Sequence, residues 1–161
     1  MSIAFSGKEL IEVAINIEKR GSAFYDIMAK STDNAAARHI FQHLASMEQD
    51  HIRIFQDMLS EADSYPPSQT SSEEYAGYLQ ALVDNAVFTD DMITSEMAIQ
   101  VDSDIKALEL GISAEKDSIL FYHQMKDIMP QRAHPTMDKI ITEEKSHLAQ
   151  LAELKRQLAA L

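Results

Sequence analysis

The chain has 161 residues, a formal net charge of −12 and no cysteine. Its acidity argues against nucleic acids and anionic membranes as partners, because both are bound through clusters of Lys and Arg. Without cysteine the chain forms no disulfide, thiolate zinc site or iron–sulfur cluster, so any metal must be held by carboxylate and imidazole groups.

Hydrophobic residues make up 45% and charged residues 25% of the chain, which is the balance of a globular protein. We expect a single domain over residues 1–161, since this length suits one hydrophobic core. No apolar run approaches the roughly 20 residues that cross a bilayer, and the N-terminal segment lacks the basic start and apolar core of a signal peptide. These features predict a cytoplasmic protein without membrane partners.

The first predicted helix begins at a capping-box sequence that runs from Ser6 to Glu9. Its inward stripe is apolar apart from a carboxylate and a serine: Ile11, Ala14, Ile15, Glu18, Ser22, Tyr25 and Met28. Turn residues at 31–34 end this helix and cap a second one. The stripe of the second helix contains a carboxylate and an imidazole three residues apart: Phe41, Leu44, Glu48, His51, Ile52, Phe55 and Met58.

A long connection follows at about 64–102. It opens with a segment at 64–72, rich in Pro, Ser, Gln and Thr, that is typical of a linker. Residues 71–74 resemble the cap of a short helix that reaches about Val83, and an irregular acidic segment is predicted from there to about Asp102. The connection is long for a helical hairpin. It can therefore run back along the molecule, so that the third long helix lies parallel to the second.

The third long helix is predicted to stop before Pro130, and Pro135 suits the first position of the fourth. The stripe of the third helix is Leu108, Gly111, Ile112, Glu115, Ser118, Tyr122 and Met125. That of the fourth is Ile140, Ile141, Glu144, His147, Leu148, Leu151 and Leu154. Both stripes again include residues that can bind a metal.

The second pair of helices repeats the first. Five residues of the first helix recur 97 residues later in the third, and the Glu-x-x-His of the second recurs 96 residues later in the fourth. The matching pairs are Glu18 and Glu115, Lys19 and Lys116, Phe24 and Phe121, Tyr25 and Tyr122, Met28 and Met125, Glu48 and Glu144, and His51 and His147. A two-fold arrangement of the two halves would bring four Glu and two His together in the centre of a bundle.

Four ionised carboxylates cannot share a low-dielectric core unless cations compensate them, and no Lys or Arg lies on the inward stripes. Two divalent metal ions would supply that charge. Carboxylate and imidazole donors suit iron, manganese or zinc, and iron or manganese would allow redox chemistry. We expect two divalent ions, with iron as the first choice, held by six candidate ligands: Glu18, Glu48, His51, Glu115, Glu144 and His147.

This ligand order resembles the rubrerythrin branch of the ferritin-like superfamily of di-iron carboxylate proteins. The resemblance extends over all four long helices and implies an all-α, ferritin-like four-helix bundle with a long crossover between its second and third helices. It also implies that the carboxylates of Glu48 and Glu144 bridge the two metals, with Glu18 and Glu115 as terminal or more labile ligands. His51 and His147 would each bind one metal.

The resemblance further implies reduction of peroxide or dioxygen at a diferrous centre, with electrons from an external donor. Two family features have no counterpart here. Rubrerythrins proper carry a rubredoxin-like domain with four cysteines, and they have a further Glu one turn after the ligand of the third helix, where this chain has Ser118. Bundles of this type commonly dimerise, which leaves a homodimer open.

Several residues near the predicted site allow two interpretations. Glu143 competes with Glu144 as a ligand because it is a helical neighbour of His147, but the repeat favours Glu144. Tyr25 and Tyr122 are candidates for hydrogen bonds to ligand carboxylates and thus for a part in catalysis, or they are simply aromatic core. The remaining histidines are expected at the surface: His39, His43, His123 and His134.

The leading functional hypothesis is a non-haem dinuclear metal protein that acts as an oxidoreductase on peroxide or dioxygen. A second hypothesis is iron handling through ferroxidation, or metal binding without turnover. A third is a structural bundle whose inner Glu residues are protonated, which predicts that Glu48→Ala or His147→Ala leaves the metal content unchanged.

Overall fold

The computed structural model describes residues 5–65, 73–90, 93 and 97–161, and within these ranges it is helical, without strands. The long helices are α1 (Gly7–Ser31), α2 (Ala35–Glu61), α5 (Asp104–Ile128) and α6 (His134–Ala159). The shorter ones are η1 (Ala62–Ser64), α3 (Glu73–Asp84), α4 (Met97–Gln100) and η2 (Gln131–Ala133). The predicted all-α class is confirmed.

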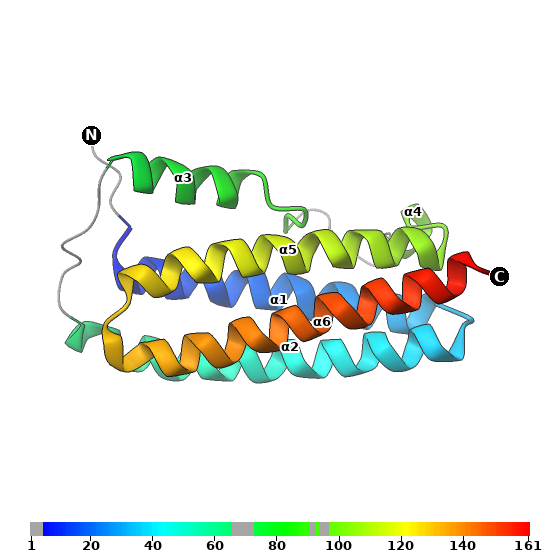
Figure 1. Ribbon diagram of the computed structural model, residues 1–161, viewed down its shortest axis with the longest axis horizontal. Helices are drawn as coiled ribbons and strands as arrows, with labels where there is room; N and C mark the ends of the chain where they lie inside the picture. The colour runs from blue at the N-terminus through cyan, green and yellow to red at the C-terminus, as the bar shows by residue number, and fades with distance from the viewer. Residues whose placement is uncertain (1–4, 66–72, 91–92, 94–96) are drawn as a thin grey trace.

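The four long helices lie side by side as a bundle (Figure 1). α1 is antiparallel to α2, and α5 is antiparallel to α6. The chain returns from the end of α2, past α3 and α4, to the opposite end of the bundle before α5 begins. α2 and α5 therefore run in the same direction, which confirms the predicted long crossover.

Polar side chains at the helix ends explain where these helices begin. Ser6 and Glu9 form the predicted capping box at α1, with the Glu9 carboxylate 2.7 Å from the Ser6 backbone N. The Asn34 side chain accepts from Ala37 N at 2.9 Å to cap α2, and Ser103 caps α5 in the same way. Each such cap stabilises a helix start by about 1 kcal/mol. Pro135 lies in the first turn of α6, one residue later than predicted.

The apolar core divides into two clusters along the bundle. One gathers the start of α1 and α6 with the end of α2 and α5, and includes Leu10, Phe55 and Ile140. The other gathers the opposite halves of the same helices, and includes Phe41 and Leu154. Buried polar side chains take up the helix positions between the two clusters. A polar site thus lies at mid-length of the bundle with apolar packing on both sides.

The predicted inward stripes are buried, except that Ile112 and Leu148 are half-buried. α3 matches the predicted short helix, whereas the linker at 66–70 and the cap at 71–72 lie outside the described residues. The segment predicted to be irregular contains α4, which corrects that prediction. A helix of four residues is too short to show periodicity, and what holds it is tertiary packing of Met97 in the second apolar cluster.

Among the described helices, none combines the length and apolarity that a membrane span requires.

Candidate metal centre

Each long helix contributes to a cluster of buried polar side chains at mid-length of the bundle. The cluster comprises Glu18 of α1, Glu48 and His51 of α2, Glu115 of α5, and Glu144 and His147 of α6. None of the six is more than 4% exposed. The fold thus brings together all six candidate ligands, because the helical period keeps each in phase with the apolar core on its own helix.

The six side chains form two overlapping groups of four. Within each group, one possible ligand atom per residue lies within 4.8 Å of the others. The first group is Glu18, Glu48, His51 and Glu144, and the second is Glu48, Glu115, Glu144 and His147. Glu48 and Glu144 belong to both, which is the arrangement that two metals with shared carboxylates would need. We call the first group the His51 subsite and the second the His147 subsite.

Both histidines turn the same ring atom, Nδ1, toward the carboxylates. His51 Nδ1 lies 2.8 Å from Glu144 Oε1 and 3.3 Å from Glu18 Oε2. His147 Nδ1 lies 3.5 Å from an oxygen of Glu48 and 3.5 Å from one of Glu144. The ring centroids are 5.7 Å apart. Each Nδ1 is therefore the atom that can ligate a metal, and each Nε2 points away from the four carboxylates of the cluster.

Two tyrosines connect α1 and α5 through the carboxylates. The Tyr25 hydroxyl of α1 donates to Glu115 Oε1 of α5 at 2.5 Å, and the Tyr122 hydroxyl of α5 donates to Glu18 Oε1 of α1. Burial, reinforced by the neighbouring carboxylates, raises the pKa of both tyrosines well above the ordinary value. Both hydroxyls therefore remain protonated and act as donors. Of the two interpretations open from the sequence, the hydrogen bonds are the one observed.

The carboxylates titrate abnormally because they are buried next to one another. Burial, followed by the charges of Glu144 and Glu18, raises the pKa of Glu48 well above its ordinary value. Burial and then Glu144 raise the pKa of Glu115 in the same way. Burial alone would raise the pKa of Glu144 too, but the close polar groups of Glu115 and of both histidines outweigh it, and the net pKa is lowered.

The pKa of His51 shows how strongly the carboxylates of the cluster favour a positive charge beside them. Burial lowers its pKa, but the carboxylates of Glu144 and Glu18, together with Glu48, outweigh burial and raise the net pKa far above the ordinary value. The cluster therefore attracts a proton onto the ring nitrogen that faces it. A divalent cation at the same place would be attracted more strongly than a proton, because the Coulomb energy scales with its charge.

The donor set fits a metal centre. Five buried polar atoms of the cluster have no hydrogen-bond partner among the described residues: Glu18 Oε2, His51 Nδ1, Glu144 Oε1, and both ring nitrogens of His147. In the described part of the chain, no Lys or Arg forms an ion pair with any of the four carboxylates. Buried polar atoms of this kind cost free energy unless something binds them.

The sequence of the chain matches the Rubrerythrin family over residues 9–155. The chain belongs to the rubrerythrin family. A crystal structure of a Thermotoga maritima protein assigned as a ferritin-like diiron-carboxylate protein superposes with a TM-score of 0.69 at 30% sequence identity, and the match covers 94% of this chain and 95% of that one. A comparison with curated proteins found no match. Family and cluster together indicate a dinuclear metal site in this rubrerythrin-family chain.

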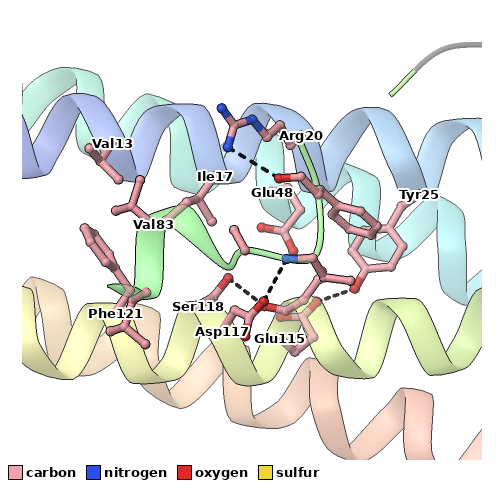
Figure 2. Close-up of a pocket in the computed structure, with 16 residues that line it drawn as sticks. Val13, Ile17, Arg20, Tyr25, Glu48, Val83, Glu115, Asp117, Ser118 and Phe121 are labelled. Atoms are coloured by element: carbon pink, nitrogen blue, oxygen red, sulfur yellow. Dashed lines mark hydrogen bonds between the residues drawn. The ribbon is translucent and has the colours of Figure 1, made fainter. Parts of the chain in front are cut away.

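A small cavity of about 50 Å³ lies against this site, between α1, α5 and the segment that contains α3 (Figure 2). Its walls are mostly apolar side chains such as Ile17 and Phe121, and its lining includes Glu48, Glu115 and Tyr25. Ser118, at the position where rubrerythrins have a further Glu, also lines it, and its hydroxyl donates to Ala114 O on its own helix. No pattern in the sequence indicated this cavity, which depends on how α3 and the residues that follow it pack against α1 and α5.

Glu143, which from the sequence competes with Glu144 as a ligand, contacts His51 from the outer side of the cluster. Glu143 lies outside both groups of four, and its Oε2 is 2.8 Å from His51 Nε2. His39, His43 and His123 are exposed, as predicted. His134 was also predicted at the surface, but it is half-buried with its Nε2 3.0 Å from Met129 O. Its position as the first residue of α6 explains the difference, because from there the ring reaches back to the residue that follows α5.

Proposed function

We propose that the protein is a non-haem di-iron oxidoreductase that reduces peroxide or dioxygen with electrons from an external donor. The proposed ligands are Glu18, Glu48, His51, Glu115, Glu144 and His147, with Glu48 and Glu144 bridging the two metals. Family membership supports the di-iron centre, and carboxylate and imidazole donors suit iron.

One observation carries the proposal: two groups of four buried candidate ligands share Glu48 and Glu144. Shared carboxylates would hold two metals about 3.5–4 Å apart, which is the spacing of two-metal sites that act on one substrate. The burial of every member excludes bulk water from the ligands. A structural role for protonated Glu residues alone would not require both imidazoles to face the same carboxylates.

When bound, two ferrous ions would supply the two electrons that reductive cleavage of an O–O bond needs. The side chains of this chain have separate tasks. The Tyr25 and Tyr122 hydroxyls donate hydrogen bonds that orient the carboxylates of Glu115 and Glu18. The cavity beside Glu48 gives a small oxidant access, and its apolar walls keep bulk water away.

The test combines metal content with a single turnover. Protein from iron-replete cells is expected to contain about two iron ions per chain, and the anaerobically reduced protein is expected to oxidise on mixing with hydrogen peroxide, followed by absorbance. His147→Ala should bind fewer ions. Absence of about two metals per chain, or full metal content in Glu48→Ala, would overturn the di-iron proposal. Full loading without reaction with either peroxide or dioxygen would overturn only the reaction.

Ferroxidation with iron handling is the second candidate, and Ser118 favours it. By resemblance, the Glu found at this position in rubrerythrins takes part in a redox-linked metal shift, whereas the Ser118 hydroxyl is bonded to Ala114 O. In this case ferrous iron is the substrate, and added Fe²⁺ beyond two per chain should be oxidised catalytically to Fe³⁺ by dioxygen, which takes up the electrons. Size-exclusion chromatography then separates a storage cage from a small oligomer.

A further inference from the structure

The internal repeat makes the two halves of the site nearly equivalent, but the outward nitrogens of the two histidines have different surroundings. His51 Nε2 on α2 is 2.8 Å from a carboxylate oxygen of Glu143 on α6. His147 Nε2 is buried without a hydrogen-bond partner among the described residues. At the offset of 96 residues that relates α2 to α6, the counterpart of Glu143 is Met47, which directly precedes Glu48 as Glu143 precedes Glu144.

A carboxylate behind a ligating imidazole affects how well the ring binds a metal. It accepts the proton of Nε2, which leaves the lone pair on Nδ1 for the metal, and it holds the ring in place and makes it more basic. Loss of such a partner commonly weakens metal binding by about 10- to 100-fold. His51 has this support, and Met47 offers His147 no charged acceptor.

The two subsites also differ in their contact with the cavity. Of the six candidate ligands, its lining includes Glu48, which the two subsites share, and Glu115, which belongs only to the His147 subsite. Gly21 has no side chain and Ser118 a small one at this wall, and a Cβ added at Gly21 would be in ordinary van der Waals contact with the Glu48 side chain, at 3.7 Å. A small molecule in the cavity therefore lies next to Glu115 of the His147 subsite, whereas the unshared ligands of the His51 subsite, Glu18 and His51, do not line the cavity.

We infer that the two metal subsites are unequal: Glu143 makes the His51 subsite the tight, retained one, and the His147 subsite binds its metal more weakly and receives the exogenous ligand. The inference rests on the dinuclear site of the proposed function. Glu143 is a positioning residue, since it acts through His51 and lies outside both groups of four.

The experiment is a titration of the metal-free protein with Zn²⁺, followed by the imidazole ¹⁵N resonances of His51 and His147. These are assigned with His51→Asn and His147→Asn variants. In the wild type, the His51 Nδ1 resonance should shift during the first equivalent and that of His147 only during the second, with dissociation constants at least about tenfold apart. Glu143→Gln should remove most of this difference, so that both resonances shift together.

Met47→Glu tests the inference by gain of function, because it gives His147 the partner that His51 has. Its second dissociation constant should fall toward the first by about tenfold or more, whereas Met47→Gln, of the same size but uncharged, should stay near the wild type. Simultaneous shifts in the wild type, or an unchanged order of filling in Glu143→Gln, would overturn the inference and leave the di-iron proposal intact. Failure to bind any Zn²⁺ would overturn both.

Discussion

The Tyr25 and Tyr122 hydroxyls form a reciprocal pair across the interface of α1 and α5. Tyr122 lies 97 residues after Tyr25, and Glu115 lies 97 residues after Glu18. Each tyrosine donates to the Glu of the other half of the repeat. The same two contacts therefore position one terminal carboxylate in each subsite. They also tie the first half of the chain to the second at the level of the cluster.

Replacement of Tyr122 tests the energy of this contact. Tyr122→Phe removes the donor to Glu18 and leaves a buried carboxylate oxygen without a partner, which should lower the free energy of unfolding by about 1–3 kcal/mol. Urea denaturation of the metal-free protein measures the change. Tyr78→Phe on α3 is the control, because Tyr78 is 41% exposed. Equal stability of the two variants would contradict the role given to the hydroxyl.

Ser118 occupies the position at which rubrerythrins proper have a further Glu. Ser118→Glu would extend a carboxylate into the cavity, toward the side of the cluster where Glu115 lies. It should strengthen binding at the His147 subsite and speed oxidation of the reduced protein by hydrogen peroxide, each by about tenfold. Ser118→Gln, which has the same shape without the charge, is the control. A Glu variant that behaves like the Gln variant would argue against a ligand role at this position.

At the scale of residues, the convergence of the six cluster members could be predicted because each is in phase with an apolar stripe and each has a partner in the repeat. The contact between Glu143 and His51 could not, since it joins residues 92 positions apart and Glu143 lies outside the inward stripe. The sequence shows only that two Glu residues are adjacent. Glu144 faces the cluster, whereas Glu143 contacts His51 on a different helix.

At the scale of elements, α1, α2, α5 and α6 could be predicted because long amphipathic helices show both periodicity and caps. The part that α3 and the residues after it play at the site could not be predicted in this way, because it depends on tertiary contacts with the bundle. Arg20 of α1 bonds Asp90 at 2.7 Å and Phe88 O at 3.5 Å, which fixes this segment over the cavity. No local pattern in residues 73–90 indicates that they cover a site.

A substitution in this covering segment should affect ligand access without affecting the metals. Ala86→Leu adds volume at the wall of the cavity, so the affinity of azide for the metal-loaded protein should fall by about tenfold, or 1.4 kcal/mol. Absorbance titration measures azide binding, and metal analysis should give the wild-type content. Ala81→Leu on the exposed face of α3 is the matched control. Unchanged azide affinity in Ala86→Leu would show that the ligand enters by another route.

At the scale of the whole molecule, the bundle buries a polar centre between two apolar clusters, so stability depends on what neutralises that centre. In the metal-free protein, bound protons must neutralise the charge of the carboxylates. Glu48 and Glu115 have raised pKa values, and His51 has a raised pKa, whereas that of Glu144 is lowered. The other groups that face them come from α1, α5 and α6: Glu18, Tyr25, Tyr122, Glu143 and His147.

These shifts predict that the metal-free protein loses stability as the pH rises from about 5 to about 8. Above the ordinary carboxyl pKa of 4.5, the unfolded chain releases protons that folded Glu48 and Glu115 keep, and above 6.5 the same holds for His51, so the folded state binds more protons. Glu144 opposes this trend only below about pH 4.5, where the unfolded chain takes up its proton. With saturating Mn²⁺ the trend should reverse, because metal binding requires deprotonated ligands and strengthens as the pH rises. Urea midpoints at several pH values, with chelator and with Mn²⁺, measure both slopes. If the two slopes had the same sign, metal would not be replacing protons at the cluster.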